Sequence, residues 1–277
     1  MHPLEGPTFQ LALILYVVSF ALYTAHLFTG ARRPERLALG ALACAFLLQT
    51  VNLGARTLEA GRAPFSNLYE SLLIFAWGTA VSLLVLQLAR RTPAAGCAVL
   101  PVIIAAMGYA TTLNAQIEPL MPALKSPWMV YHVATAILAY GAFAVAGGLG
   151  VLYIVRDALE KRGIRSALVD RLPSLDLLDR LTYSTIAFAF PFMVLVLITG
   201  AVWAQKAWGT YWQWDPKETW ALITTLVYAG YLHARQMMKF RGLASAWFAV
   251  IGFCVVIFCY LGVNLFLSGL HSYGSGM

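Results

Sequence analysis

Tryptophan is the residue type whose spacing in this sequence is most unusual. Five of the eight tryptophans lie in the run WAQKAWGTYWQWDPKETW, from Trp203 to Trp220, between two long apolar segments. Indole rings supply flat apolar surface and an N–H donor, which suits a large flat ligand at a membrane surface. The alternative is the aromatic belt that occurs at every bilayer interface. A belt does not require five tryptophans and Tyr211 in one connecting segment, nor Gly209, which would let backbone approach a ligand closely. We therefore favour a ligand platform.

Two histidines are expected on the same side of the membrane as this run. His132 lies about one helical turn into the fifth apolar run, and His271 lies just beyond the eighth. An isolated histidine at a membrane interface is often only a hydrogen-bonding residue. Two imidazoles and an aromatic surface on one face, however, meet the needs of haem, which takes axial nitrogens at iron and apolar contacts around the porphyrin. Zinc fits less well, because no third or fourth ligand clusters with them.

The remaining histidines and the cysteines give weaker signals. His233 lies near the inner end of the seventh apolar run, His26 near the inner end of the first, and His2 at the terminus. A polar residue that faces the bundle interior is the simplest interpretation of His26. All four cysteines lie inside apolar runs without CxxC spacing, so we predict packing residues rather than a dithiol redox site. They are Cys44, Cys97, Cys254 and Cys259.

Membrane-spanning helices must position these residues. The chain of 277 residues is 60% hydrophobic and 11% charged, whereas soluble domains carry about 25% charged residues. A span needs roughly 20 apolar residues. The sequence therefore predicts an all-α, polytopic membrane protein with about eight transmembrane helices. The apolar runs are 9–29, 37–55, 67–89, 95–113, 128–155, 183–203, 217–236 and 244–268.

Loop charges predict the orientation of these spans. Fourteen Lys and Arg residues lie in the loops 30–36, 90–94, 156–182 and 235–243, and five lie in the opposite loops. Positive residues favour the cytoplasmic side, so both termini and the tryptophan-rich segment are expected outside. The net charge of +7 is explained by these orientation signals, and no nucleic-acid partner is expected.

The chain is expected to form one integral-membrane domain, residues 1–277. We divide it into N-terminal spans (1–115) and a ligand-handling core (126–277) that carries an external tryptophan-rich loop (203–220).

Cap-and-proline patterns mark the helix starts. The order Asp215-Pro216-Lys217-Glu218 predicts a capping box with proline at the first helical position, which explains Asp215 without a ligand. Ser126-Pro127 and Thr92-Pro93 show the same order. In the longest inner loop, the leucines of PSLDLLDRL (173–181) predict a short interfacial helix.

The segment WGTYWQWDPKETWAL (208–222) resembles the tryptophan-rich WWD signature of a superfamily of haem-handling membrane proteins. Its continuation DPKETWAL is similar to the CcsA (ResC) branch, of system II cytochrome c biogenesis, whereas CcmC and CcmF diverge after the WD. Three further stretches agree, and the resemblance runs from about residue 60 to the end. They are PFSNLYES (64–71), His132 at the head of its span, and GVN (262–264) leading to GLHSYG (269–274).

The resemblance implies an enzyme: the haem-binding half of a cytochrome c haem lyase (synthase) that acts with a CcsB (ResB) membrane protein. Haem b would pass outward and be joined externally to the CxxCH motif of apocytochrome c. His132 and His271 would be the catalytic pair and the external iron ligands, and His233 would ligate an inner haem with a histidine of CcsB. The cofactor-binding set would be Trp203, Trp208, Gly209, Tyr211, Trp212, Trp214, Asp215, Trp220 and His233.

Two other functions stay open. One is a haem exporter or chaperone without ligase activity, and the other is a haem-containing electron-transfer subunit. A multi-pass protein of the bacterial cytoplasmic membrane, with its active site on the periplasmic face, is favoured over a thylakoid protein. Further residues are considered for the propionates (Tyr69, Tyr273, Arg56, Arg62, Lys206, Lys217), as external carboxylates (Glu70, Glu218) or as interhelical hydrogen bonders (Asn52, Asn264).

Overall fold

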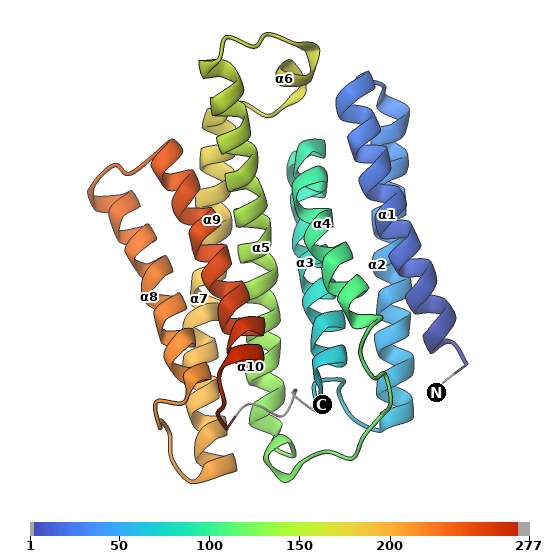
Figure 1. The fold of residues 1–277 in the computed structure, drawn as a ribbon, viewed down its shortest axis with the longest axis vertical. Helices are drawn as coiled ribbons and strands as arrows, with labels where there is room; N and C mark the ends of the chain where they lie inside the picture. The colour runs from blue at the N-terminus through green and yellow to red at the C-terminus, as the bar shows by residue number, and fades with distance from the viewer. Residues whose placement is uncertain (1–2, 271–277) are drawn as a thin grey trace.

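The structure is a computed structural model, and it describes residues 3–270 as a helical bundle (Figure 1). This confirms the prediction of an all-α polytopic protein. The elements are α1 (Glu5–Thr29), α2 (Arg32–Ala60), α3 (Leu68–Arg90), α4 (Pro93–Ala110), the 3₁₀ turn η1 (Pro122–Leu124), α5 (Pro127–Lys161), α6 (Ala167–Arg171), α7 (Leu175–Trp208), α8 (Pro216–Met237), α9 (Leu243–Ile257), the π-helical segment η2 (Phe258–Gly262) and α10 (Val263–Phe266).

Seven candidate spans are found within the described residues. They are α1, α2, α3, α4, α5, α7 and the continuous stretch Leu243–Phe266, each long and apolar enough to cross a membrane. The predicted run 217–236 coincides with α8, which lies beside α7 and α9 (Figure 1). Its more polar composition leaves α8 outside the set of seven.

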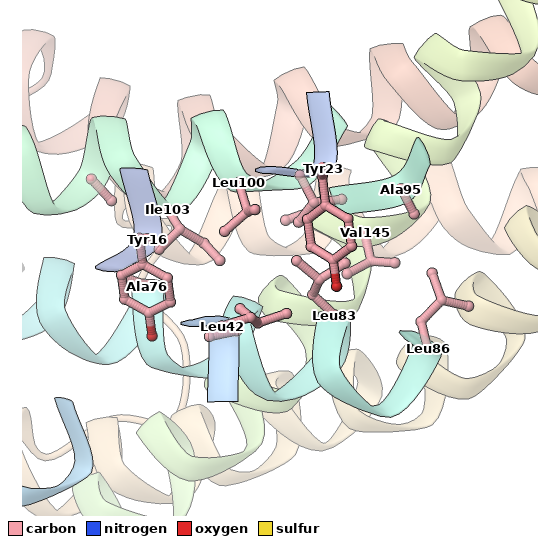
Figure 2. Close-up of a cluster of buried hydrophobic side chains, with 14 of the residues drawn as sticks. Tyr16, Tyr23, Leu42, Ala76, Leu83, Leu86, Ala95, Leu100, Ile103 and Val145 are labelled. Carbon is pink, nitrogen blue, oxygen red and sulfur yellow. The ribbon is translucent and has the colours of Figure 1, made fainter. Parts of the chain in front are cut away.

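The bundle has two parts that meet at α5. Helices α3 and α4 contact α5 on one side, with α1 and α2 packed beyond them, and α7, α8 and α9 lie on the other side (Figure 1). The first part is closed by apolar side chains from several helices, among them Tyr16, Leu42, Leu83 and Leu100 (Figure 2). The α7–α8 connection lies at the same end of the bundle as the start of α1 (Figure 1). The tryptophan-rich segment is therefore at one end of the bundle and α6 at the other.

Small residues let α5 approach its neighbours closely. A Cβ added at Gly141 would fall on the backbone of Gly78 in α3, and one at Gly150 would fall 2.8 Å from the Ala246 carbonyl in α9. Close backbone approach at glycine is a common way to pack helices in lipid, where apolar burial alone gives little driving force. These glycines fix α5 at the centre of the bundle.

Helix caps follow the sequence patterns in two of three places. The Ser126 side chain accepts from the Trp128 amide, and Asp215 with Glu218 forms the predicted capping box. Thr92 occupies the N-cap position of α4 but makes no side-chain cap bond.

One local prediction is wrong. Ser174 caps α7, and the leucines expected on a short interfacial helix form the first turns of that long helix. Leu178 is fully buried and Leu181 nearly so. The predicted short helix is therefore not a separate element: it is the start of α7, and its leucines pack against the bundle. The short helix of this region is α6.

A buried ionic cluster joins the first helices at the tryptophan-rich end. The Arg56 guanidinium bonds the carboxylates of Glu5 and Glu70, the latter at 2.9 Å, and the Ala115 carbonyl at 2.8 Å. Arg62 pairs with the other Glu70 oxygen at 3.0 Å. Both arginines and Glu70 thus have structural partners, which argues against their predicted use toward a ligand.

Candidate functional site

The last turns of α7 carry two of the five clustered tryptophans. Trp203 is 4% exposed, and its indole N–H donates to the Ala123 carbonyl at 2.9 Å. The Trp208 ring lies 5.0 Å from it, with the ring planes at 56°. Leu124 and Met129 pack on the same cluster. Because the Trp203 indole is packed and hydrogen-bonded, it forms a fixed wall at this end of the bundle.

His132 lies against that wall, in the second turn of α5. Its ring stacks on Trp203 at 5.7 Å with 28° between planes, and its Nδ1 lies 3.0 Å from the Val196 carbonyl of α7. A carbonyl oxygen only accepts, so Nδ1 carries a proton and donates it to Val196, and in a neutral ring the lone pair would then be at Nε2. Metal-ligating histidines commonly show this pattern, with the second nitrogen bonded to a carbonyl.

Two cavities meet at this histidine. The larger is about 210 Å³, lies between α3, α5 and η2, and is mostly apolar. The smaller, about 70 Å³, lies between α5, α7 and α8 and reaches Tyr211 and Trp212. His132, Tyr140 and Lys217 line both. An imidazole, a phenol and an ammonium therefore border the same space.

Lys217 supplies a positive charge to the two cavities at His132. Its Nζ donates to the Tyr260 carbonyl at 3.0 Å and to Asn264 Oδ1 at 2.7 Å. The acceptor Tyr260 belongs to the π-helical segment η2, and single π-turns inside α-helices often occur at functional sites. Lys217 lies in the first turn of α8, outside the seven candidate spans, and burial lowers its pKa to about 8. Both partners of its Nζ are hydrogen-bond acceptors, which suits the ammonium form.

Asp215 does two things at the α7–α8 connection. One oxygen, Oδ1, caps α8 by accepting from the Lys217 amide at 2.9 Å. The other, Oδ2, accepts from the Leu270 amide at 2.6 Å. The predicted cap is confirmed, and the carboxylate also ties the end of the described chain to the tryptophan-rich segment.

The other tryptophans are arranged differently from one another. Trp212 and Trp214 meet edge to face at 5.5 Å, and Trp214 is 68% exposed. Trp220 packs on Phe258 of η2 at 4.3 Å. The five indoles therefore do not form one continuous surface. Trp203 pairs with Trp208, Trp212 pairs with Trp214, and Trp220 packs on a phenylalanine instead. Gly209 ends α7 with a φ of +83°, a conformation that favours glycine.

The predicted external loop is shorter in the structure than in the sequence interpretation. Residues 203–208 complete α7 and 216–220 begin α8, so only 209–215 connect helices. Tyr211 is exposed in this connection.

The remaining histidines lie elsewhere. His233 is exposed near the far end of α8. His26 Nδ1 bonds the Ala31 carbonyl at 2.8 Å across the α1–α2 turn, which is a structural role. Figure 1 places α1 and α8 at opposite sides of the bundle, so these two rings do not form a pair. His271 lies outside the described residues 3–270, as do His2 and Tyr273.

Sequence reasoning missed Gly200. A Cβ there would lie 2.9 Å from His132 Cε1 and Nδ1, so the absence of a side chain makes room for the imidazole. A glycine in an apolar helix gives a signal that cannot be separated from ordinary helix packing.

The predicted roles of two asparagines as interhelical hydrogen bonders are confirmed. Asn264 Oδ1 accepts a hydrogen bond from Lys217 Nζ, and the Asn52 side chain donates to the Glu5 carbonyl at 2.7 Å.

Residues 65–271 match the family model described as cytochrome C assembly protein. A protein of Guillardia theta named cytochrome c biogenesis protein CcsA is 38% identical over 283 residues, covering 95% of this chain and 93% of the relative. A protein of the same name from Synechococcus elongatus is 38% identical over 319 residues, covering 99% and 97%.

A solved structure has a similar fold. Cytochrome c Heme Lyase CcmF aligns with a TM-score of 0.68 at 18% identity, covering 94% of this chain and 47% of CcmF. The chain thus spans about half the length of that protein. At this identity the likeness concerns the fold alone.

Proposed function

Because this chain belongs to the cytochrome c assembly protein family, we propose that it is the haem-binding subunit of a cytochrome c synthase. It receives haem b across a bacterial cytoplasmic membrane and holds it at the tryptophan-rich end, on the periplasmic face. A CcsB-type membrane protein completes the enzyme, and apocytochrome c with a CxxCH motif is the acceptor.

The observation that carries this proposal is the setting of His132. Its ring is fixed between Trp203 and the Val196 carbonyl, and it lines two cavities together with Lys217. Haem needs a nitrogen ligand for iron, apolar surface for the porphyrin and a cation for its propionates. An imidazole, aromatic walls and an ammonium in one place match these three needs.

His271 is the second external ligand in this proposal. It lies outside the described residues, but Leu270, its neighbour in sequence, is hydrogen-bonded to Asp215. Asp215 is followed directly by the helix that carries Lys217. The bond at Leu270 supports the idea that the C-terminal histidine and His132 serve the same haem.

The reaction adds a thiol to a vinyl group. Each of the two cysteine sulfurs of CxxCH bonds to the inner carbon of one haem vinyl, the hydrogen of that thiol goes to the outer carbon of the same vinyl, and its C=C bond becomes single. No oxidant or leaving group is needed. The protein contributes positioning, which turns an encounter of two molecules into a nearly unimolecular step. The incoming CxxCH histidine replaces one protein imidazole on iron, and this exchange favours release of the product.

His233 forms part of an inner haem site in this proposal. Its exposed position near the far end of α8 suits a ligand shared with a second membrane protein, because no described histidine of this chain lies beside it. His233→Gly should reduce haem that co-purifies with the complex, and added imidazole should restore it. Unchanged haem content in His233→Gly would refute the inner site.

A haem exporter or chaperone remains the second candidate function. The same cavity-facing imidazole would serve a carrier, and only covalent attachment separates the two. An electron-transfer subunit is disfavoured, because it expects pairs of histidines stacked across the bilayer. His26 belongs to α1 and His233 to α8, and these two helices lie on opposite sides of the bundle (Figure 1).

Co-expression of the full chain with a CcsB-type partner and a CxxCH apocytochrome tests the proposal. Covalent haem is measured after denaturing electrophoresis. His132→Ala and His271→Ala should each abolish the product, whereas His26→Ala should retain it. Wild-type yield from both site variants would refute the assignment. Haem that binds to the wild-type complex but is never attached would favour the carrier.

A further inference from the structure

We propose that a second binding site, for the phosphate-bearing headgroup of an anionic lipid, lies between the ends of α1, α2 and α3 that are remote from the tryptophan-rich segment. This inference is independent of the haem proposal, since it uses none of the same residues.

The site is a cavity with basic walls. Its volume is about 430 Å³, and more of its lining is polar than in the cavities at His132. Arg32 and Arg36 stand one turn apart at the start of α2, and Arg91 follows the end of α3. The complete lining is Tyr23, Arg32, Glu35, Arg36, Leu39, Gln87 and Arg91.

The positive charges in this lining are not balanced by the protein. Within residues 3–270, the side chains of Arg32, Arg36 and Arg91 make no ion pair or hydrogen bond. Glu35 is the one carboxylate of the lining, which leaves a surplus of two positive charges (three arginines minus one glutamate).

Several other arginines at the same end are partnered. Arg156 pairs with Glu160, Arg171 donates to the Leu27 carbonyl, and Arg235 pairs with Asp179. Arg33, Arg162 and Arg165 at this end also lack a side-chain partner among the described residues, but they do not line the cavity. Arg32, Arg36 and Arg91 are thus the arginines without a partner that are gathered around one cavity. Guanidinium groups suit phosphate because they donate two parallel hydrogen bonds to it.

A buried hydroxyl points to a ligand independently of the charges. Tyr23 is 1% exposed and lines the cavity, and its Oη has no hydrogen-bond partner among the described residues. Figure 2 shows the Tyr23 ring extending from α1 toward α3 beside Leu83. The hydroxyl of Thr92, next to Arg91, is also buried without a partner. Since burying an unbonded hydroxyl is unfavourable, an acceptor oxygen supplied by a ligand would stabilise Tyr23.

Apolar neighbours favour a lipid over a soluble phosphate compound. Leu37 follows Arg36 and Leu88 follows Gln87, and both leucines are largely exposed on helices that qualify as membrane spans. Acyl chains would lie against such surfaces while the headgroup enters the cavity. Basic pockets between the ends of membrane helices are a known setting for anionic headgroups.

Native mass spectrometry of the full chain in detergent, titrated with phosphatidylglycerol or phosphatidylcholine, tests this proposal. Each arginine near a lipid phosphate contributes about fivefold in affinity. The triple variant Arg32→Gln, Arg36→Gln, Arg91→Gln should therefore lose roughly hundredfold in affinity for phosphatidylglycerol. Tyr23→Phe removes only the hydroxyl and should weaken binding by about twofold to tenfold.

A matched control separates the cavity from the general positive charge of this end. Arg33→Gln, Arg162→Gln, Arg165→Gln removes the same charge from exposed residues that do not line the cavity. This variant should bind phosphatidylglycerol nearly as well as the wild type. Equal losses in the two triple variants would overturn the site. Displacement of the lipid by millimolar inorganic phosphate alone would show a free-phosphate site and refute the lipid assignment. Equal binding of phosphatidylcholine would refute the requirement for negative charge.

Discussion

At the scale of single residues, the setting of His132 depends on a side chain that is absent. The imidazole is held by Trp203 on one face and by the Val196 carbonyl at Nδ1. Gly200, on the same helix as both, leaves the space that the ring edge occupies. The position of the ring is thus determined by helix α7 rather than by its own helix.

Substitution of Gly200 tests this dependence. In Gly200→Ala the added Cβ would lie 2.9 Å from two imidazole atoms, so the ring must shift, and misplacement of a reacting group by about 1 Å can cost a hundredfold in rate. We expect covalent haem yield to fall by at least tenfold, roughly the scale of such positional effects. Gly230→Ala in α8 is the matched control, since a Cβ there meets nothing within 4 Å, and it should leave the yield unchanged. Loss of yield in both variants would mean that helix flexibility, not ring position, matters.

Lys217 also makes a prediction at this scale. Lys217→Met keeps the length and removes the ammonium, so affinity for haem should fall by roughly tenfold to a hundredfold, as for loss of a charge-assisted hydrogen bond. Affinity for haem dimethyl ester, whose propionates are neutral, should hardly change. The measurement is absorbance titration of the purified complex. Equal losses of affinity for haem and for its dimethyl ester would show that Lys217 stabilises the fold and does not bind the haem propionates.

At the scale of elements, the α7–α8 connection and the C-terminal segment are linked through one carboxylate. Asp215 caps α8 with Oδ1 and holds the Leu270 amide with Oδ2. A Cβ added at Gly269 would collide with that carboxylate. The approach of two distant segments therefore requires an aspartate and a glycine together.

Two substitutions of Asp215 separate its roles. Asp215→Asn retains an oxygen for the cap but presents an amide N–H₂ where Leu270 N–H needs an acceptor. Asp215→Ala removes both acceptors, and loss of the helix cap alone should lower the free energy of unfolding by about 1 kcal/mol. We expect Asp215→Asn to keep thermal stability near wild type while haem yield falls, and Asp215→Ala to lower both. Full haem yield in Asp215→Asn would show that the bond to Leu270 is dispensable.

At the scale of the whole molecule, a buried ionic cluster around Arg56 connects the helices of the first half of the bundle. Arg56 is fully buried and bridges Glu5 of α1, Glu70 of α3 and the Ala115 carbonyl of the connection to α5. A buried charged group that loses its partner strongly destabilises the fold, because it is no longer solvated by water. The cluster thus holds together segments that are far apart in sequence.

Arg56→Met should consequently be strongly destabilising. It leaves two carboxylates without their shared partner, and breaking a buried pair typically costs about 3–5 kcal/mol. Arg180→Met is the control, because Arg180 and Asp176 form an exposed pair on α7, and such pairs contribute roughly 0–1 kcal/mol. Thermal unfolding in detergent measures both. Similar unfolding temperatures for the two variants would contradict the role of the buried cluster.

Much of this protein follows from its sequence alone. Long apolar runs dictate helices, because backbone groups in lipid must bond within their own segment, and each of the eight predicted runs coincides with a helix. The box at Asp215 and Glu218 and the cap at Ser126 depend on residues within four positions of each other, so local sequence determines them. The tryptophan-rich signature likewise indicated the family from contiguous residues.

Tertiary structure decided which of these residues meet. Only packing brings Lys217 of α8 to Asn264 of α10, Arg56 to Glu70, and the His132 ring to Gly200. The same packing buries Trp203 and leaves Trp214 in the open, although both belong to one short run. Periodicity and capping act over a few residues along the chain, whereas these contacts depend on how helices distant in sequence cross and how closely small residues let them approach.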